Sequence, residues 1–170
     1  MLVKALKGTL FGLMITIASV QFSSCKKEVM IPKSVNIKSV TVLNFPESNS
    51  SGNPWDGSLQ GSYPDVYFQI RDINSNIIYT HPSSLRKENI RKSDLPFTWN
   101  STTNFVSFSN LDQGISIVLY DFESLTSDEF MGGVKTNTTF KSLVADGDLP
   151  KEMSLSFGEY SFKLGLEWVF

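Results

Sequence analysis

Residues 120–133 contain the side chains of this chain that are best suited to chemistry. Asp121 and Glu123 directly follow an apolar stretch, and four residues separate Glu123 from Asp128 and Glu129. In an extended segment Asp121 and Glu123 point to the same side, because alternate residues of a strand share a face. The chain then has enough length to double back and bring Asp128 and Glu129 close to them. Carboxylates that meet in this way repel one another unless protons or a cation neutralise them.

Carboxylate oxygens on a flexible loop favour a calcium ion, because Ca²⁺ is a hard cation that takes oxygen ligands in adaptable geometry. The same residues are also compatible with a solvated acidic turn. A zinc site made of Cys and His side chains is excluded, because Cys25 and His81 are the only residues of their types in the chain. His81 lies in a Thr-His-Pro turn sequence with no nucleophile motif nearby.

The segments that must position these residues have the pattern of short strands with turns between them. Strands are expected over residues 35–43, 66–71, 77–79, 97–108 (in two pieces), 115–120 and 160–170. A change of phase at Ser39 predicts a bulge in the first of them or a later start of that strand. Short helical turns are expected over 85–92 and 139–144. Seven or eight strands without a helical period predict an all-β fold, an antiparallel eight-stranded β-sandwich.

The composition fits one globular domain. The chain has 170 residues, of which 41% are hydrophobic and 13 are phenylalanine, so a proper core can be buried. The formal net charge of −2 gives no support for nucleic-acid binding.

The first 25 residues have the pattern of an export signal. Lys4 and Lys7 precede an apolar run over 10–20, and small residues lead to Cys25. The apolar run is short for a membrane span. The pattern resembles a bacterial lipoprotein signal peptide, and an ordinary cleaved signal or an N-terminal anchor is the alternative.

The lipoprotein resemblance implies that residues 1–24 are removed and that Cys25 is lipidated. The lipid would hold the chain to the outer membrane of the bacterial cell envelope, on its periplasmic or surface-exposed face. Residues 25–34 are then a tether, and residues 35–170 form the folded domain.

A second resemblance begins at the acidic loop. The pattern Asp121-x-Glu123, five residues, then Glu129-Phe130-Met131-Gly132 resembles the third calcium loop and the following strand of C2 domains, a family of calcium- and lipid-binding β-sandwiches. The segment 63–68, Tyr-Pro-Asp-Val-Tyr-Phe, resembles the family's first-loop segment. The likeness extends over residues 35–170 and implies a C2-like Greek-key sandwich.

This resemblance implies a Ca²⁺ site between the first and third loops at one end of the sandwich. Its ligands would come from Asp56, Asp65, Asp121, Glu123 and Glu129, with Asp128 replacing or assisting Glu129. The chain departs from the family in two ways: the interval between Asp56 and Asp65 is long, and two third-loop positions are Glu where Asp is usual. Trp55 and Leu125 fall near the tips of the two loops, and Trp55 is expected to fold back over the core.

The function that follows is a non-enzymatic, lipid-anchored module that binds Ca²⁺ and contacts a protein or a phospholipid surface. The first alternative is a structural or protein-interaction lipoprotein with a vestigial site that binds no metal. A carbohydrate-binding module requires Trp55 and Trp99 to form an exposed platform, although Trp99 lies in an alternating strand that favours the core. A glycosidase requires Asp121 to work with Glu123 or Asp65 as a carboxylate pair.

Overall fold

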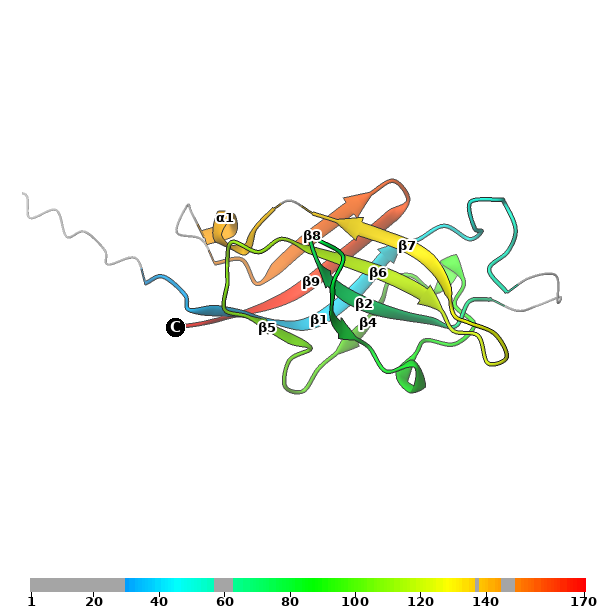
Figure 1. Ribbon diagram of the computed structural model, residues 1–170, viewed down its shortest axis with the longest axis horizontal. Helices are drawn as coiled ribbons and strands as arrows, with labels where there is room; N and C mark the ends of the chain where they lie inside the picture. Colours follow the sequence, from blue (N-terminus) through cyan, green and yellow to red (C-terminus); the bar gives the residue numbers. More distant parts are fainter. Residues whose placement is uncertain (1–29, 57–62, 137, 145–148) are drawn as a thin grey trace, which may run out of the picture.

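The computed structural model describes residues 30–56, 63–136, 138–144 and 149–170 (Figure 1). The expected signal peptide, the lipidation site Cys25 and the first half of the tether lie outside the described residues. Within the described ranges, no helix is long and apolar enough to cross a membrane.

The described residues form nine strands in two antiparallel sheets. The first sheet contains β1 (Ser34–Asn44), β4 (Phe97–Asn100), β5 (Val106–Phe108), β8 (Glu152–Phe157) and β9 (Tyr160–Val169). The second sheet contains β2 (Val66–Asp72), β3 (Ile77–Thr80), β6 (Ile115–Asp121) and β7 (Glu129–Lys135).

The strand order makes the molecule an eight-position sandwich. The first sheet runs β4-β1-β9-β8 and the second runs β3-β2-β6-β7. β4 pairs with residues 39–42 of β1 and β5 pairs with residues 35–37, so the two short strands are halves of one strand position, as the sequence predicts for 97–108. The chain crosses between the sheets after β1, β3, β5 and β7, as in Greek-key sandwiches. The expected antiparallel β-sandwich is confirmed.

Local sequence signals account for most of the strands. The pairing of β1 with β9 shifts register between Ile37 and Ser39, which confirms the predicted bulge. The β2–β3 hairpin turns through Ser75, whose φ of 70° closes the tight connection. β8 was not expected as a separate strand, because only Met153 and Leu155 are buried in its serine-rich sequence.

Three short helical segments lie between the strands: η1 (Ser83–Leu85), η2 (Lys92–Asp94) and α1 (Phe140–Val144). The expected turn over 139–144 is confirmed as α1. The prediction of a helical turn over 85–92 is wrong. The backbone of Lys87 instead forms an antiparallel β-bridge with Val66, the first residue of β2.

The core fills the space between the facing sheets. Alternate residues of each strand point inward, among them Phe162 and Leu164 of β9, both fully buried. Trp55 and Trp99 are each 5% exposed and belong to this core, which confirms that Trp55 folds back. The carbohydrate-binding prediction requires these two tryptophans to form an exposed platform, and because both are buried it is wrong. His81 is also buried, with its ring stacked on Phe68 at 4.9 Å, and is a core residue.

Strand register brings the acidic loops together. Asp121 lies opposite Val66 of β2 on one side and opposite Glu129 of β7 on the other. The loop that enters β2 and the loop between β6 and β7 therefore start from neighbouring strand ends. Figure 1 shows the start of β2 and the loop between β6 and β7 at the right-hand end of the sandwich, away from the C-terminus.

Candidate metal-binding site

Asp121 is the buried centre of the acidic end. It is the last residue of β6 and follows the inward alternation of Ile115, Ile117 and Leu119, so its side chain points into the sandwich and has 0% exposure. Its Oδ1 accepts a hydrogen bond of 2.7 Å from the backbone N–H of Asp65. Its Oδ2 is buried and has no hydrogen-bond partner among the described residues. A buried carboxylate oxygen without a partner is costly, and it points to a ligand or a proton.

Two further carboxylates converge on Asp121. Asp56 and Glu123 each place one oxygen so that these two atoms and one oxygen of Asp121 all lie within 4.8 Å of one another. Oxygens that bind the same Ca²⁺ lie at about 2.3–2.6 Å from the ion, so they can be up to roughly 5 Å apart. The spacing of the three oxygens therefore fits a calcium ion without rearrangement of the strands. Glu123 is two residues beyond Asp121 on the same side, as the sequence predicts.

The electrostatics of the cluster penalise its ionised form. Burial is the main cause that raises the pKa of Asp121 to about 7, against the lowering effect of the Asp65 N–H. The Asp56 and Glu123 carboxylates raise this pKa further. The pKa of Asp56 is also raised, mainly by burial and next by the charge of the Glu123 carboxylate. At neutral pH a positive charge placed between them would favour the ionised forms of Asp121 and Asp56.

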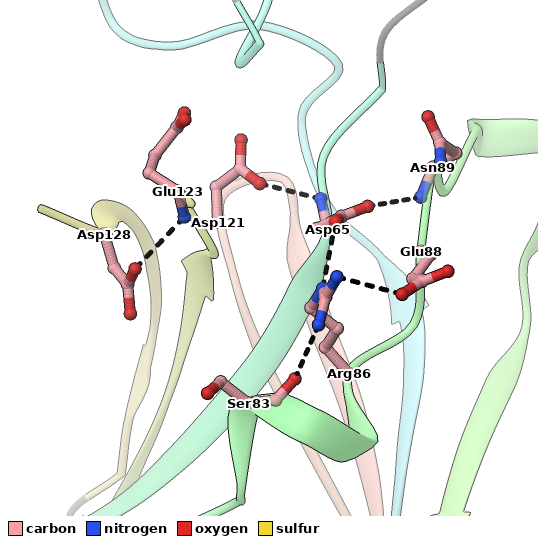
Figure 2. Close-up of polar contacts among 8 residues, drawn as sticks. All are labelled: Asp65, Ser83, Arg86, Glu88, Asn89, Asp121, Glu123 and Asp128. Carbon is pink, nitrogen blue, oxygen red and sulfur yellow. Dashed lines mark hydrogen bonds and ion pairs between the residues drawn. The ribbon is translucent and has the colours of Figure 1, made fainter. Parts of the chain in front are cut away.

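The carboxylate of Asp65 faces a different partner. Its Oδ2 accepts from Nε of Arg86 at 2.9 Å, and its Oδ1 accepts from the backbone N–H of Asn89 at 2.8 Å. Figure 2 shows this carboxylate directed to Arg86 and Asn89, away from the carboxylates of Asp121 and Glu123. Asp65 thus contributes its backbone N–H to the cluster, while its side chain is already neutralised by an internal cation.

Arg86 joins several parts of this end of the sandwich. Its guanidinium also pairs with Glu88 at 2.9 Å, and it lies 4.4 Å from the ring centroid of Phe122, which follows Asp121. Since the Arg86 side chain is only 22% exposed, these contacts are partly shielded from solvent. The sequence carries no signal for this residue, because it lies in the irregular connection between β3 and β4.

Asp128 supports the loop between β6 and β7, the third loop of the C2-like pattern, from outside the three-carboxylate cluster of Asp56, Asp121 and Glu123. Its Oδ2 accepts from the hydroxyl of Tyr67 at 2.8 Å, and its Oδ1 accepts from the backbone N–H of Glu123 at 3.1 Å. Burial and the neighbouring Asp128 raise the pKa of Tyr67, so its hydroxyl remains a donor. Asp128 therefore fixes the loop that carries Glu123. Its position in the sequence is equally compatible with this role and with the role of a metal ligand.

Glu129 has a hydrogen-bond partner outside the cluster. It opens β7 opposite Asp121, and its Oε1 accepts a long hydrogen bond of 3.5 Å from the amide of Asn49. Leu125, in the loop between β6 and β7, is 95% exposed. Of the six predicted metal ligands, the structure places Asp56, Asp121 and Glu123 within ligand distance of one another and gives Asp65, Asp128 and Glu129 the protein partners described.

Comparisons with known proteins give a distant likeness. No protein-family model matches the chain, and a search of curated proteins gives no match. Among solved structures, C2 domain A of plant extended synaptotagmin 1 is similar, with a TM-score of 0.40 and 16% identity over 82% of this chain and 97% of that one. C2 domains A and B of extended synaptotagmin 2 give a TM-score of 0.35 and 16% identity, covering 96% of this chain and 48% of that chain. Likeness at this level does not assign the chain to a family, so the site is interpreted from its own residues.

Proposed function

We propose that the chain is a non-enzymatic binding module of the C2 type, in which Asp56, Asp121 and Glu123 hold a calcium ion between the first and third loops. The observation that carries this proposal is Oδ2 of Asp121, which is buried, lacks a hydrogen-bond partner in the described part of the chain and lies beside two other carboxylates. A bound Ca²⁺ would be a positively charged partner for this oxygen. The chain's own part is to hold the three oxygens at the spacing that the ion requires.

Arg86 reduces the number of carboxylates that are available to bind metal ions. Its guanidinium already neutralises Asp65, so that carboxylate is not available to a second metal unless the 2.9 Å pair opens. The Asp65 N–H bond to Asp121 and the Asp128 bond to Glu123 position the two remaining third-loop carboxylates. We infer that calcium orders both loops together, because its ligands come from each of them.

The partner is proposed from the surface next to the site. Leu125 is the large apolar side chain exposed on the third loop, and it would be available to a phospholipid surface or a protein. If a lipid on Cys25 anchors the chain to the outer membrane, a second membrane-binding contact is not needed. We therefore favour a protein partner on the periplasmic or exterior face of the cell envelope.

An enzymatic role on the same carboxylates is disfavoured by access. A glycosidase built on Asp121 requires that its carboxylate reach a glycosidic bond, and the side chain of Asp121 has no exposed surface. A small ion needs only to enter between the loops, which a polysaccharide chain does not do. The carboxylates thus suit a metal better than a sugar.

Calorimetric titration of Ca²⁺ into residues 33–170, the segment that contains every described strand, tests the proposal. We expect saturable binding and a higher melting temperature, because a ligand that binds only the folded state adds about 2.7 kcal/mol at a hundred times its Kd. Both effects should disappear in the double variant Asp121→Asn, Glu123→Gln. The matched control is Asp112→Asn with Glu152→Gln, which removes two carboxylates that pair with surface lysines and should leave binding unchanged.

A vestigial site is the second candidate, and two observations favour it. Arg86 provides an internal cation for Asp65, and a pKa of about 7 allows Asp121 to stay protonated, so the loops can be stable without metal. If millimolar Ca²⁺ changes neither heat nor melting temperature, the metal proposal is refuted. The chain is then a structural or protein-interaction module that retains the sandwich alone.

A further inference from the structure

Four large apolar side chains are exposed where β1 begins and β9 ends. Met30 and Ile31 precede β1, Val169 ends β9 and Phe170 follows it, and the exposed fractions of these four residues lie between 38% and 76%. The backbone N–H of Lys33 donates to the carbonyl of Val169 at 2.7 Å, and the pairing of β1 with β9 starts at the next residue. Two segments that are far apart in the sequence therefore place their apolar residues at the same end of the molecule. We call these four residues the end patch; exposed apolar residues that gather in this way mark a contact surface.

The end patch and the acidic loops lie at opposite ends of the sandwich. β1 has 11 residues and leads away from the end patch; at about 3.3 Å per residue it is roughly 33 Å long. The segment after β1 reaches the acidic end, because the amide of Asn49 donates to Glu129, which lies opposite Asp121. Figure 1 shows the start of β1 beside the C-terminus at the left-hand end. About one strand length therefore separates the end patch from the carboxylate cluster.

The expected lipidation site is close to the end patch along the chain. Cys25 is five residues before Met30. An extended chain spans at most about 3.6 Å per residue, so a lipid on Cys25 would keep Met30 within roughly 18 Å of the membrane surface. If the acidic end faced the membrane, Met30 would be roughly 33 Å from the surface, which this tether does not span.

Exposed lysines lie next to the end patch. The register of β1 with β9, continued by one residue, puts Lys33 opposite Phe170. Lys151 follows Pro150, whose carbonyl accepts from the indole N–H of Trp168 at 2.8 Å. Neither lysine has an ion-pair partner in the described part of the chain. Ammonium groups beside apolar side chains suit a membrane surface, because the apolar groups enter the boundary region while the charges stay among anionic headgroups.

We propose that the end patch rests on the lipid surface and that the acidic end faces away from the membrane. This orientation rests on the lipid anchor of the proposed function and adds the direction in which the anchored domain points. The lipid already holds the chain at the surface, so the contact of four side chains becomes intramolecular and sets orientation more than affinity. The carboxylate cluster is then presented to a protein partner about one strand length from the membrane, beyond the reach of a lipid headgroup.

Fluorescent labels on introduced cysteines test this orientation in the full chain, produced with its own signal segment. The lipidated protein is placed in vesicles of phosphatidylethanolamine and phosphatidylglycerol that contain a nitroxide-bearing lipid as quencher. The Ser34→Cys variant carries its label beside the end patch, and the Ser127→Cys variant carries it on the loop between β6 and β7. A lipidated Cys25 has no free thiol and takes no label. We expect quenching and blue-shifted emission at position 34 and neither at position 127, in EDTA and in Ca²⁺ alike.

Substitutions in the end patch separate its contact from the lipid anchor. Ile31→Ser with Phe170→Ser should abolish quenching at position 34, while the protein still sediments with the vesicles through its lipid. The matched control is Leu43→Ser with Leu125→Ser, which removes two exposed apolar side chains away from the end patch and should leave the quenching unchanged. All four positions are exposed, so both double variants should melt with the parent.

Three results would overturn the proposed orientation. They are an unquenched label at position 34, a quenched label at position 127, and a label at position 34 that is shielded from water but not quenched. The last result would mean that a second copy or another segment of the chain covers the end patch. Mass spectrometry of the peptide that contains Cys25 reports on the anchor separately, and a chain without lipid refutes the anchor and the orientation together. A lipidated chain with an unquenched label at position 34 refutes the orientation alone, and Ca²⁺ titration of the same sample tests the metal site independently.

Discussion

The backbone N–H of Asp65 donates to Oδ1 of Asp121 over 2.7 Å, which joins the residue before β2 to the last residue of β6. This bond satisfies one carboxylate oxygen and leaves the other buried without a partner among the described residues. The two loops of the acidic end therefore begin from a fixed pair of residues. Whatever neutralises Asp121 controls both loops, since its carboxylate is held between them.

The first prediction concerns pH in the absence of metal. Burial raises the pKa of Asp121 from an ordinary value of 3.8 to about 7, so the folded state binds a proton that the unfolded chain releases. The stability that depends on this proton is fully present below the unfolded pKa and is lost as the pH rises through about 7. We expect the metal-free protein to lose up to about 4 kcal/mol from this source between pH 4 and pH 8.

Urea unfolding in EDTA across this range measures the effect, and Asp121→Asn is the comparison. His81 acts in the opposite direction, because burial lowers its pKa and its contribution is lost as the pH falls below the unfolded value of 6.5. Both proteins contain His81, so the difference between their pH profiles isolates Asp121. Parallel profiles would show that Asp121 does not take up a proton on folding.

The second prediction concerns the contact between β6 and β7. Gly133 pairs with Val118, and a Cβ at Gly133 would collide with the carbonyl oxygen of Ile117 and the Cα of Val118. These atoms belong to the backbone of a buried strand, so they cannot move away as a flexible side chain can. We expect Gly133→Ala to lower the free energy of unfolding by roughly 1–3 kcal/mol.

Thermal and urea unfolding measure this loss. Ser154→Ala, at an exposed position in β8, is the control and should stay within about 0.5 kcal/mol of the parent. Stability equal to that of the control would mean that β7 can shift away from β6 at little cost.

Alternation in the sequence was sufficient to predict most of the fold. From Tyr160 to Trp168, β9 alternates large apolar with small or polar residues, and the change of phase at Ser39 marks the bulge in β1. β8 escaped prediction because its two buried residues give too short a pattern among serines. Its place in the sheet is decided by pairing with β9, which is information from the tertiary structure.

Spacing along the chain predicted one pair of the candidate site, Asp121 and Glu123, and the resemblance to C2 domains predicted Asp56. The spacing of Asp121 and Glu123 puts both on one side, and the structure brings both into the cluster with Asp56. The partner of Asp65 was not predictable, because Arg86 lies 21 residues away in a connection without periodicity. No local pattern indicates which of several acidic side chains an arginine in such a segment will reach.

The third prediction follows from that arginine. Arg86→Gln removes the cation that pairs with Asp65 and packs on Phe122, and it leaves a partly buried carboxylate with weaker hydrogen bonding. We expect the metal-free protein to lose roughly 1–3 kcal/mol, the range for a charged hydrogen-bonded pair that loses one partner. Because Asp65 can then turn toward the other carboxylates, added Ca²⁺ should raise the melting temperature of Arg86→Gln by more than it raises that of the parent.

Arg91→Gln is the matched control, since the Arg91 guanidinium also packs on an aromatic ring, that of Tyr63 at 4.5 Å, and Arg91 lies outside the pair that neutralises Asp65. Its response to Ca²⁺ should equal the parent's. Differential scanning calorimetry of the three proteins, each with EDTA and with saturating Ca²⁺, makes the comparison. If Arg86→Gln and Arg91→Gln respond alike, Arg86 is only a structural contact. A larger calcium response in Arg86→Gln alone means that the arginine, as an internal cation, keeps the Asp65 carboxylate from the metal.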